Sequence, residues 1–330
     1  MQAVYLGNDA ATLFDVYGPR QRERIVQLVG MEPPVLTTRE QVAQGGRDAE
    51  VAFCTWGNLQ LTEAEIASWL PNLKAVFYAA GSVQGFARPY FSRGVRIFSA
   101  WHANAVPVAE YTFAQILLAT KGFFQVQPLT HKNRGAARKL FEAYPGNYGV
   151  RVGLLGCGAI GRLVAEMLRS TALEVLVFDP FLPQAEADEL GVRLATMEEI
   201  FATCIVVSNH LANLPATQGI IQRGHFTSML PYATFINTGR GAQLNEQDLY
   251  DALVQDPTRT ALLDVLIDEQ GTDENPLNRL HNCFITPHIA GSSGLEKQRM
   301  ADYMADAFIQ YERGETCPYE VSLKMLDTMA

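Results

Sequence analysis

Four side chains capable of acid–base or anion-binding chemistry follow short apolar runs in the second half of the chain. Arg240 comes after "ATFIN", and His288 comes after "CFIT". Asp264 ends "TALLD", and Glu269 follows five residues later. An imidazole changes charge near neutral pH, so His288 could take a proton in one direction and return it in the other. A carboxylate such as Glu269 would fix the tautomer and orientation of that ring.

Arg240 adds the recognition of a carboxylate, because the guanidinium fork matches the two oxygens and can polarise an adjacent carbonyl. Each residue also has a structural interpretation. Arg240 could form a surface ion pair, and Glu269 could be a solvated loop acid. Asp264 could cap a turn or only support the residues that contact a substrate, and His288 could be a structural residue in a tight turn. The surrounding elements decide between these interpretations.

The strongest motif lies in "VRVGLLGCGAIGRLVAEMLR", which contains Gly156-x-Gly158-x-x-Gly161. An apolar strand precedes the glycines, an amphipathic helix follows them, and a second strand ends at Asp179. The first glycine permits the sharp turn, the second lets the backbone approach a pyrophosphate, and the third allows close packing of helix and strand. The N–H groups at the helix N-terminus would bind that phosphate.

Asp179 can accept hydrogen bonds from both ribose hydroxyls of an adenosine, whereas a 2′-phosphate would meet like charge. No Lys or Arg lies between Asp179 and Arg193 to relieve that repulsion, so the motif predicts NAD rather than NADP. The predicted cofactor-binding residues are Gly156, Gly158, Ala159, Ile160, Gly161, Asp179, Thr238 and Asp264. A nicotinamide beside an acid–base histidine and an arginine indicates the interconversion of a 2-hydroxy acid and a 2-oxo acid.

Apolar runs alternate with helical patterns along nearly the whole chain. We predict strands at residues 3–6, 51–55, 75–79, 95–99, 150–155, 174–178, 204–208, 233–237, 260–264 and 283–286. Capping boxes begin helices at Thr62 and Thr196, Asn245 caps a third helix, and residues 107–124 form a long apolar helix. Such alternation predicts parallel sheets with crossover helices, and therefore an α/β chain whose ligands bind beyond the carboxyl ends of the strands.

Composition excludes several other classes of protein. The 330 residues are 48% hydrophobic and 18% charged, and the net charge is −9, so we expect neither a nucleic acid partner nor a membrane partner. Five dispersed cysteines without a C-x-x-C pair indicate a reducing, cytoplasmic location and no metal site. The N-terminus does not resemble a secretory signal.

Over nearly all of its length the chain resembles the D-isomer-specific 2-hydroxyacid dehydrogenase family. The segments that carry the resemblance are "GLLGCGAIGRL", "VFDP", "INTGRG", "LDVLIDEQ", "TPHIAGSS", "PNLKAV" and "VPVAEYT". It implies that Arg240, Glu269 and His288 are catalytic and that Asp264 lies near the nicotinamide. It also implies two doubly wound domains and a homodimer that forms through the helix at 107–124. The substrate domain would be flavodoxin-like and built from residues 1–103 and 299–330. A Rossmann cofactor domain at 104–298 would be inserted between these two segments of the sequence.

Departures from the family pattern concern the substrate loop. The family usually has a G-x-G-V-D loop that offers N–H groups to the substrate carboxylate, and this chain has "AAGSV" at residues 79–83. We therefore expect Ala80, Gly81 and Ser82 at the substrate carboxylate, with the cradle altered. No Lys or Arg occurs from Asp48 through Leu73, so Trp56 favours an uncharged or apolar substrate tail, the alternative being that Trp56 is a core residue. The family's "EP" is Glu269-Gln270 here, and "HLANLPAT" replaces its H-x-P-x-T segment.

Two other functions remain open at this point. Formate-dehydrogenase-like chemistry would be expected to place glutamine at the position of Glu269, so the glutamate argues against it. An NAD-sensing binding protein, like the transcriptional corepressors that resemble this family, would keep the same residues without turnover.

Overall fold

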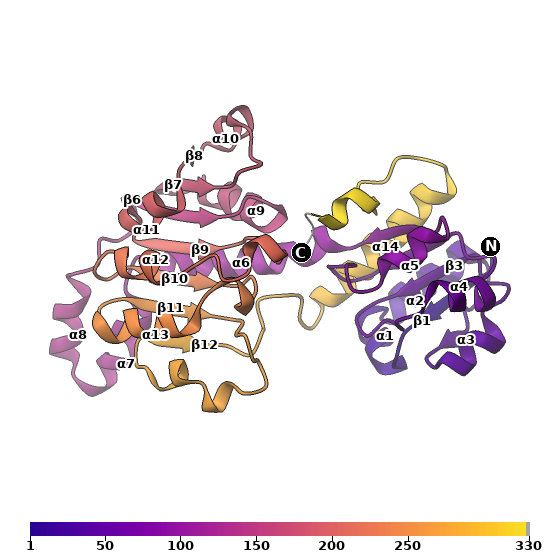
Figure 1. Cartoon of the computed structure of the whole chain (residues 1–330), viewed down its shortest axis with the longest axis horizontal. Coiled ribbons are helices and arrows are strands. Elements are labelled where there is room, and N and C mark those ends of the chain that lie inside the picture. Colours follow the sequence, from indigo (N-terminus) through magenta and orange to yellow (C-terminus); the bar gives the residue numbers. More distant parts are fainter. Residues whose placement is uncertain (328–330) are drawn as a thin grey trace. The chain divides into compact units, whose positions relative to one another are not determined.

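The computed structural model describes residues 1–327, which form two compact units. Unit 1 comprises Met1–Ala105 together with the chain from Ser292 on, and unit 2 comprises Val106–Gly291. Each unit is an α/β layer structure with helices on the outside of its sheet (Figure 1). The α/β class with two parallel-strand sheets is as predicted from the sequence.

The sheet of unit 1 has the order β13-β5-β4-β3-β1-β2. Its strands are β1 (Ala3–Leu6), β2 (Val35–Leu36), β3 (Val51–Cys54), β4 (Ala75–Tyr78), β5 (Arg96–Ser99) and β13 (Glu320–Val321). The first five strands are parallel, in the order 2-1-3-4-5 of a flavodoxin-like sheet. The sequence did not reveal β2 or β13, each of two residues, and β13 pairs antiparallel with β5, so this sheet is mixed rather than purely parallel.

Both faces of this sheet are buried because its side chains alternate between two apolar clusters. Val4 and Leu6 pack on one face with helices α3 (Arg39–Gly45), α4 (Glu63–Trp69) and α5 (Ala87–Ser92). Ala3 and Tyr5 pack on the other with α1 (Ala10–Val16), α2 (Pro19–Val29) and α14 (Glu296–Glu312). A short 3-10 helix, η5 (Leu323–Asp327), follows β13. The predicted capping box at Thr62 is present, with Glu65 closing it.

The sheet of unit 2 is parallel throughout, in the order β12-β11-β10-β9-β6-β7-β8. Its strands are β6 (Tyr148–Leu155), β7 (Ala172–Phe178), β8 (Arg193–Leu194), β9 (Val206–Asn209), β10 (Thr234–Asn237), β11 (Thr260–Leu263) and β12 (Cys283–Ile285). This is the strand order of a Rossmann fold, extended by one strand. The two-residue β8 was not predicted.

Seven helices complete unit 2 beside the part of α6 that belongs to it. They are α7 (Phe123–Lys132), α8 (Arg134–Phe141), α9 (Ala159–Leu168), α10 (Gln184–Leu190), α11 (Met197–Thr203), α12 (Arg223–Ser228) and α13 (Glu246–Gln255). The 3-10 turns are η1 (Pro215–Thr217), η2 (Gly241–Gln243), η3 (Thr272–Glu274) and η4 (Pro276–Arg279). Asn245 caps α13, as predicted, by accepting from the Asp248 N–H at 3.1 Å.

Two predicted helix boundaries are wrong. The helix predicted at residues 107–124 corresponds to α6 (Trp101–Ala119). This helix begins six residues before Pro107, which lies inside it, and ends at Ala119 rather than at Phe124. The break occurs because Gly122 has a left-handed φ of +66° and begins α7. At Thr196 only half of the predicted capping box forms. The Thr196 hydroxyl accepts from the Glu199 N–H, but the Glu199 carboxylate accepts from Arg193 at 2.6 Å instead.

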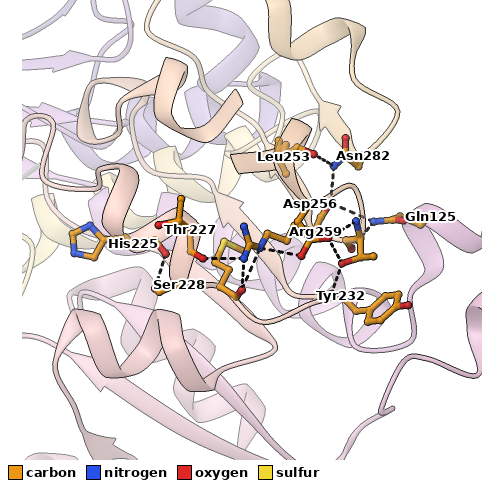
Figure 2. Close-up of polar contacts among 11 residues, drawn as sticks. Gln125, His225, Thr227, Ser228, Tyr232, Leu253, Asp256, Arg259 and Asn282 are labelled. Atoms are coloured by element: carbon orange, nitrogen blue, oxygen red, sulfur yellow. Dashed lines mark hydrogen bonds and ion pairs between the residues drawn. The ribbon is translucent and has the colours of Figure 1, made fainter. Parts of the chain in front are cut away.

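A buried arginine joins several elements of unit 2 at the amino-terminal end of β11. Arg259 is 8% exposed, and its guanidinium donates to the carbonyls of Met229 and Thr227 at 2.8 and 2.9 Å (Figure 2). These carbonyls belong to the last turn of α12 and the residue after it, so the arginine caps that helix. Gln125 of α7 and Asn282 add amide donors to the same region at 2.6–3.3 Å.

Candidate active site

The glycine motif of unit 2 forms a tight turn between β6 and α9. Gly156 has φ +93°, and a Cβ at that position would lie 2.6 Å from the carbonyl oxygen of His210. A Cβ at Gly161 would overlap the Gly156 carbonyl, so only glycine allows this approach of helix to strand. Gly158 is the N-cap of α9, and no atom lies within 4 Å of the position of its missing Cβ. The exposed Gly158 backbone and the helix N-terminus therefore fit a pyrophosphate.

Asp179 lies just past the end of β7, beside this turn. One carboxylate oxygen accepts from the Cys157 N–H at 2.7 Å, and the other accepts from the Phe181 N–H at 2.8 Å. A carboxylate has about four lone-pair positions, so the side chain is held in place and can still accept from ribose hydroxyls. Burial raises the pKa of the adjacent Cys157 thiol to about 11, which keeps it neutral. Ala159 and Ile160 form the first turn of α9, half-buried next to the cradle.

His288 and Glu269 are in direct contact. The Nδ1 atom of His288 lies 3.0 and 3.1 Å from the two carboxylate oxygens of Glu269. A carboxylate only accepts, so Nδ1 carries the hydrogen and Nε2 is left as the acceptor. The two side chains are 46% and 45% exposed, so the pair is open to solvent rather than buried. His288 also has φ +56°, one of two non-glycine positive φ values among residues 1–327.

The loop that carries His288 is anchored by Asp264. This carboxylate is 2% exposed and accepts from the Thr286 hydroxyl at 2.6 Å and from the N–H groups of Ile289 and Ala290 at 2.8 and 2.9 Å. The Asp264 carbonyl also accepts from the His288 N–H at 3.0 Å. Its recorded hydrogen bonds thus hold the histidine loop. The sequence placed Asp264 among the predicted cofactor-binding residues, and in the structure its side chain holds the loop that carries His288.

Arg240 follows β10 and is exposed. Its guanidinium donates to the Gly239 carbonyl at 2.8 Å, and within residues 1–327 it forms no hydrogen bond with His288. The next residue, Gly241, fits against the backbone of Leu266 and Ile267, where a Cβ would overlap main-chain atoms. The loop between β10 and η2 carries Arg240 and is called the arginine loop below. It therefore lies against the segment that leads to Glu269. Thr238 is 7% exposed, with its hydroxyl 3.2 Å from that of Thr112 on α6.

The predicted substrate residues lie in unit 1, where the chain leaves β3 and β4. Ala80 is fully buried, and its carbonyl accepts from the Ser99 hydroxyl at 3.0 Å. Across residues 1–327 no acceptor is recorded for the N–H of Gly81 or Ser82, so both are available to an anion. Trp56 is half-buried and packs against both apolar clusters of its unit. Its core role is thus clear, and part of its surface remains accessible.

Residues 113–290 match the family model described as D-isomer specific 2-hydroxyacid dehydrogenase, NAD binding domain. The chain belongs to this family. The match covers more than half of the chain and nearly all of unit 2, so this unit is the NAD-binding domain that the family shares.

Curated relatives are similar across much of the chain. A D-3-phosphoglycerate dehydrogenase of Archaeoglobus fulgidus is 26% identical over 266 residues, which is 80% of this chain and 50% of the relative. One from Mycobacterium tuberculosis is 29% identical over 264 residues, 79% of this chain and 49% of the relative. The chain spans about half the length of these dehydrogenases. A glyoxylate reductase of Korarchaeum cryptofilum is 26% identical over 267 residues, which is 80% of this chain and 80% of the relative.

Solved structures of this fold extend over almost the whole chain. An NAD complex of a D-isomer specific 2-hydroxyacid dehydrogenase from Lactobacillus delbrueckii ssp. bulgaricus has a TM-score of 0.76 at 19% identity, covering 97% of this chain and 99% of the other. A D-lactate dehydrogenase from Treponema pallidum has a TM-score of 0.73 at 20% identity, covering 98% and 100%. At such identities the likeness establishes the fold. No helix within residues 1–327 has the length and apolar character of a membrane span.

Sequence reasoning missed several polar residues that hydrogen-bond to one another and to the loops carrying the candidate site residues. They are Tyr111, Thr112, Asn209, Asn237, Gln243 and Thr286. Asn209 and Asn237 had one signal, since each is a polar residue at the end of an otherwise apolar strand. Gln243 had none, because only the fold brings it beneath the arginine loop.

Proposed function

We propose that the chain is an NAD-dependent D-2-hydroxyacid dehydrogenase that interconverts a D-2-hydroxy acid and its 2-oxo acid. The observation that carries the proposal is the His288–Glu269 pair at 3.0 Å, within a unit whose glycine turn fits a dinucleotide. Bound NAD supplies the acceptor for the hydrogen that leaves the substrate carbon together with its electron pair. This chain's own residues supply the proton transfer, the orientation and the anion binding.

The proposed roles follow from the geometry of each side chain. His288 Nε2 accepts the proton of the substrate hydroxyl and returns it to the carbonyl in the reverse direction. Glu269 holds the ring by Nδ1 and stabilises the imidazolium that forms. Arg240 binds the substrate carboxylate through its fork. In unit 1, the N–H groups of Gly81 and Ser82, which have no acceptor within residues 1–327, are further proposed donors to a carboxylate.

We also propose a substrate whose tail is uncharged. Residues 48–73 contain no Lys or Arg, and in the chain that leaves β3 Trp56 is half-buried whereas Thr55 and Asn58 are buried. A phosphorylated tail would need a cation to offset its charge. For the domain roles we propose residues 104–298 as the cofactor domain and residues 1–103 and 299–330 as the substrate domain, bounds that differ by a few residues from those of units 1 and 2. A cytoplasmic location is supported by five buried cysteines that are all free.

A homodimer is the proposed assembly. Beside α6, α7 and α8 lies an apolar groove of about 360 Å³. Leu118, Phe123 and Phe141 in its lining are 39%, 45% and 38% exposed. Such contiguous apolar exposure is costly in water and is typical of a protein interface, for which we propose a second copy of this chain. Phe123→Glu is expected to shift the protein toward the monomer in analytical ultracentrifugation, whereas a monomeric parent would refute the assembly.

The function is tested by following NADH consumption with pyruvate, phenylpyruvate, glyoxylate, hydroxypyruvate and a phosphorylated 2-oxo acid. We expect turnover with a member whose tail is uncharged, and loss of that turnover in Arg240→Ala and His288→Ala. Preference for the phosphorylated compound would refute the proposed substrate class. Tight NADH binding without turnover on any 2-oxo acid would instead favour an NAD-sensing binding protein. Equal affinity for NADP and NAD would contradict the role given to Asp179.

A further inference from the structure

Three fully buried amide side chains lie directly beneath the arginine loop of unit 2. Asn209 ends β9, Asn237 ends β10, and Gln243 ends η2, and each is 0% exposed. Buried amides need hydrogen-bond partners, and these three find most of theirs in one another and in the surrounding backbone. They form an uncharged network at the carboxyl ends of two adjacent strands.

This network holds the backbone of Arg240 on both sides. The Arg240 N–H donates to Gln243 Oε1 at 3.1 Å, and the Arg240 carbonyl accepts from Asn237 Nδ2 at 3.2 Å. The preceding N–H, that of Gly239, donates to Asn237 Oδ1 at 3.1 Å. The main chain at Arg240 is therefore held by two amide side chains together with a hydrogen bond from the Gln243 main-chain N–H to the Arg240 carbonyl at 3.3 Å. The Arg240 guanidinium donates to the Gly239 carbonyl.

Asn209 connects the other two amides to each other. Its Nδ2 group donates to Gln243 Oε1 at 2.6 Å and to Asn237 Oδ1 at 3.0 Å. Its Oδ1 atom accepts from the Leu211 N–H at 3.2 Å. Both hydrogens of this amide are thus used, and moving any one of the three amides disturbs the other two.

Gln243 is the member that fixes the network to the neighbouring loop. Its Nε2 group donates to the carbonyls of Leu211 and Ala212 at 2.6 and 3.0 Å. That loop has other supports, since the His210 N–H donates to the Leu155 carbonyl at 2.7 Å and the Thr217 hydroxyl donates to the Ala212 carbonyl. Removing the Gln243 amide should therefore release the arginine loop more than the loop at residues 210–212.

We propose that Gln243, acting with Asn209 and Asn237, is a positioning residue that aims the Arg240 guanidinium at the substrate carboxylate. The inference rests on the proposed function, because it assigns that target to Arg240. A neutral network suits the task, since a carboxylate in the same place would compete with the substrate for the guanidinium. The position of a binding group matters because a displacement of about 1 Å can cost about 100-fold in rate.

The test compares Gln243→Leu with Gln247→Leu, an exposed glutamine on α13 whose amide contacts Asp251. We expect Gln243→Leu to lower kcat/KM for the 2-oxo acid about 100-fold, with the NADH dissociation constant changed less than about 3-fold. The control should match the wild type. In an Arg240→Ala background the same Gln243→Leu change should cost less than about 3-fold, because the group it positions is already absent.

Equal losses in the two backgrounds, or an unchanged kcat/KM, would overturn the proposal. Should Gln243→Leu fail to fold, Gln243→Asn replaces it, because the shorter amide cannot reach both Arg240 and the carbonyls of residues 211 and 212. A wild-type protein that turns over no 2-oxo acid would refute the proposed function instead. The positioning is then decided by hydrogen exchange, in which the Arg240 amide should exchange faster in the folded variant than in the wild type. Unchanged protection would refute it.

Discussion

Replacing His288 with asparagine should separate catalysis from architecture at the corner where β12 ends. The imidazole contacts Glu269 at 3.0 Å, but both side chains are almost half exposed, at 46% and 45%. A pair this exposed contributes at most about 1 kcal/mol to stability. The main-chain hydrogen bonds from His288 N–H to the Asp264 and Thr286 carbonyls, 3.0 and 2.9 Å, do not depend on the side chain.

The backbone conformation of residue 288 suits asparagine better than histidine. With φ at +56°, His288 is in the left-handed region, which costs a typical L-residue roughly 1–2 kcal/mol and costs asparagine less. Relief of strain and loss of the ion pair therefore nearly cancel. We expect the unfolding free energy to change by less than about 1 kcal/mol, and the melting temperature by less than about 4 °C. Loss of the acid–base group should lower kcat/KM by about 10²–10⁴.

Steady-state NADH consumption and thermal unfolding of the same preparation measure both quantities. Tyr232, with φ +65°, provides the matched control, because Tyr232→Asn changes a left-handed residue whose ring packs against Tyr144, away from the proposed site. That variant should lose stability and keep its activity. The acid–base assignment would fail if His288→Asn retained more than about a tenth of the wild-type kcat/KM, or melted more than about 10 °C lower. The histidine would then have a structural role in the turn after β12.

Three further predictions concern the supports of the site. Asp264→Ala removes a buried acceptor of three hydrogen bonds and should destabilise the protein in urea unfolding by roughly 1–3 kcal/mol for each donor left unpaired; a total change below about 1 kcal/mol would contradict its anchoring role. Gly241→Ala should displace the arginine loop and cost about 100-fold in kcat/KM, whereas Gly224→Ala, where a Cβ meets open space, should cost nothing. Burial lowers the pKa of His210 to about 4, so the unfolded chain takes up a proton first, and stability should fall as the pH drops from about 6.5 to about 4. That slope should flatten in His210→Asn, and an identical pH dependence of the two proteins would rule out this histidine as its source.

The features that local sequence determines are those whose partners lie a few residues away. The strand–glycine–helix turn at Gly156–Gly161 and the caps at Thr62 and Asn245 were predictable, because backbone sterics and first-turn hydrogen bonds fix them. Unbroken apolar runs predicted the buried strands of both sheets and the parallel architecture that follows from them. The contact between Glu269 and His288 was predictable, since the two residues follow neighbouring strands.

Tertiary structure alone decided what depends on residues far apart in the chain. Asn209 and Gln243 are 34 positions apart and meet only because β9 and β10 are adjacent, and Asp264 reaches the histidine loop across a similar pairing of β11 with β12. The two-residue strands β2, β8 and β13 have too few side chains for a periodic signal and exist because a longer neighbour offers them partners. The left-handed backbone of His288 likewise follows from the buried Asp264 beside it, whose carbonyl and carboxylate accept hydrogen bonds that no local pattern encodes.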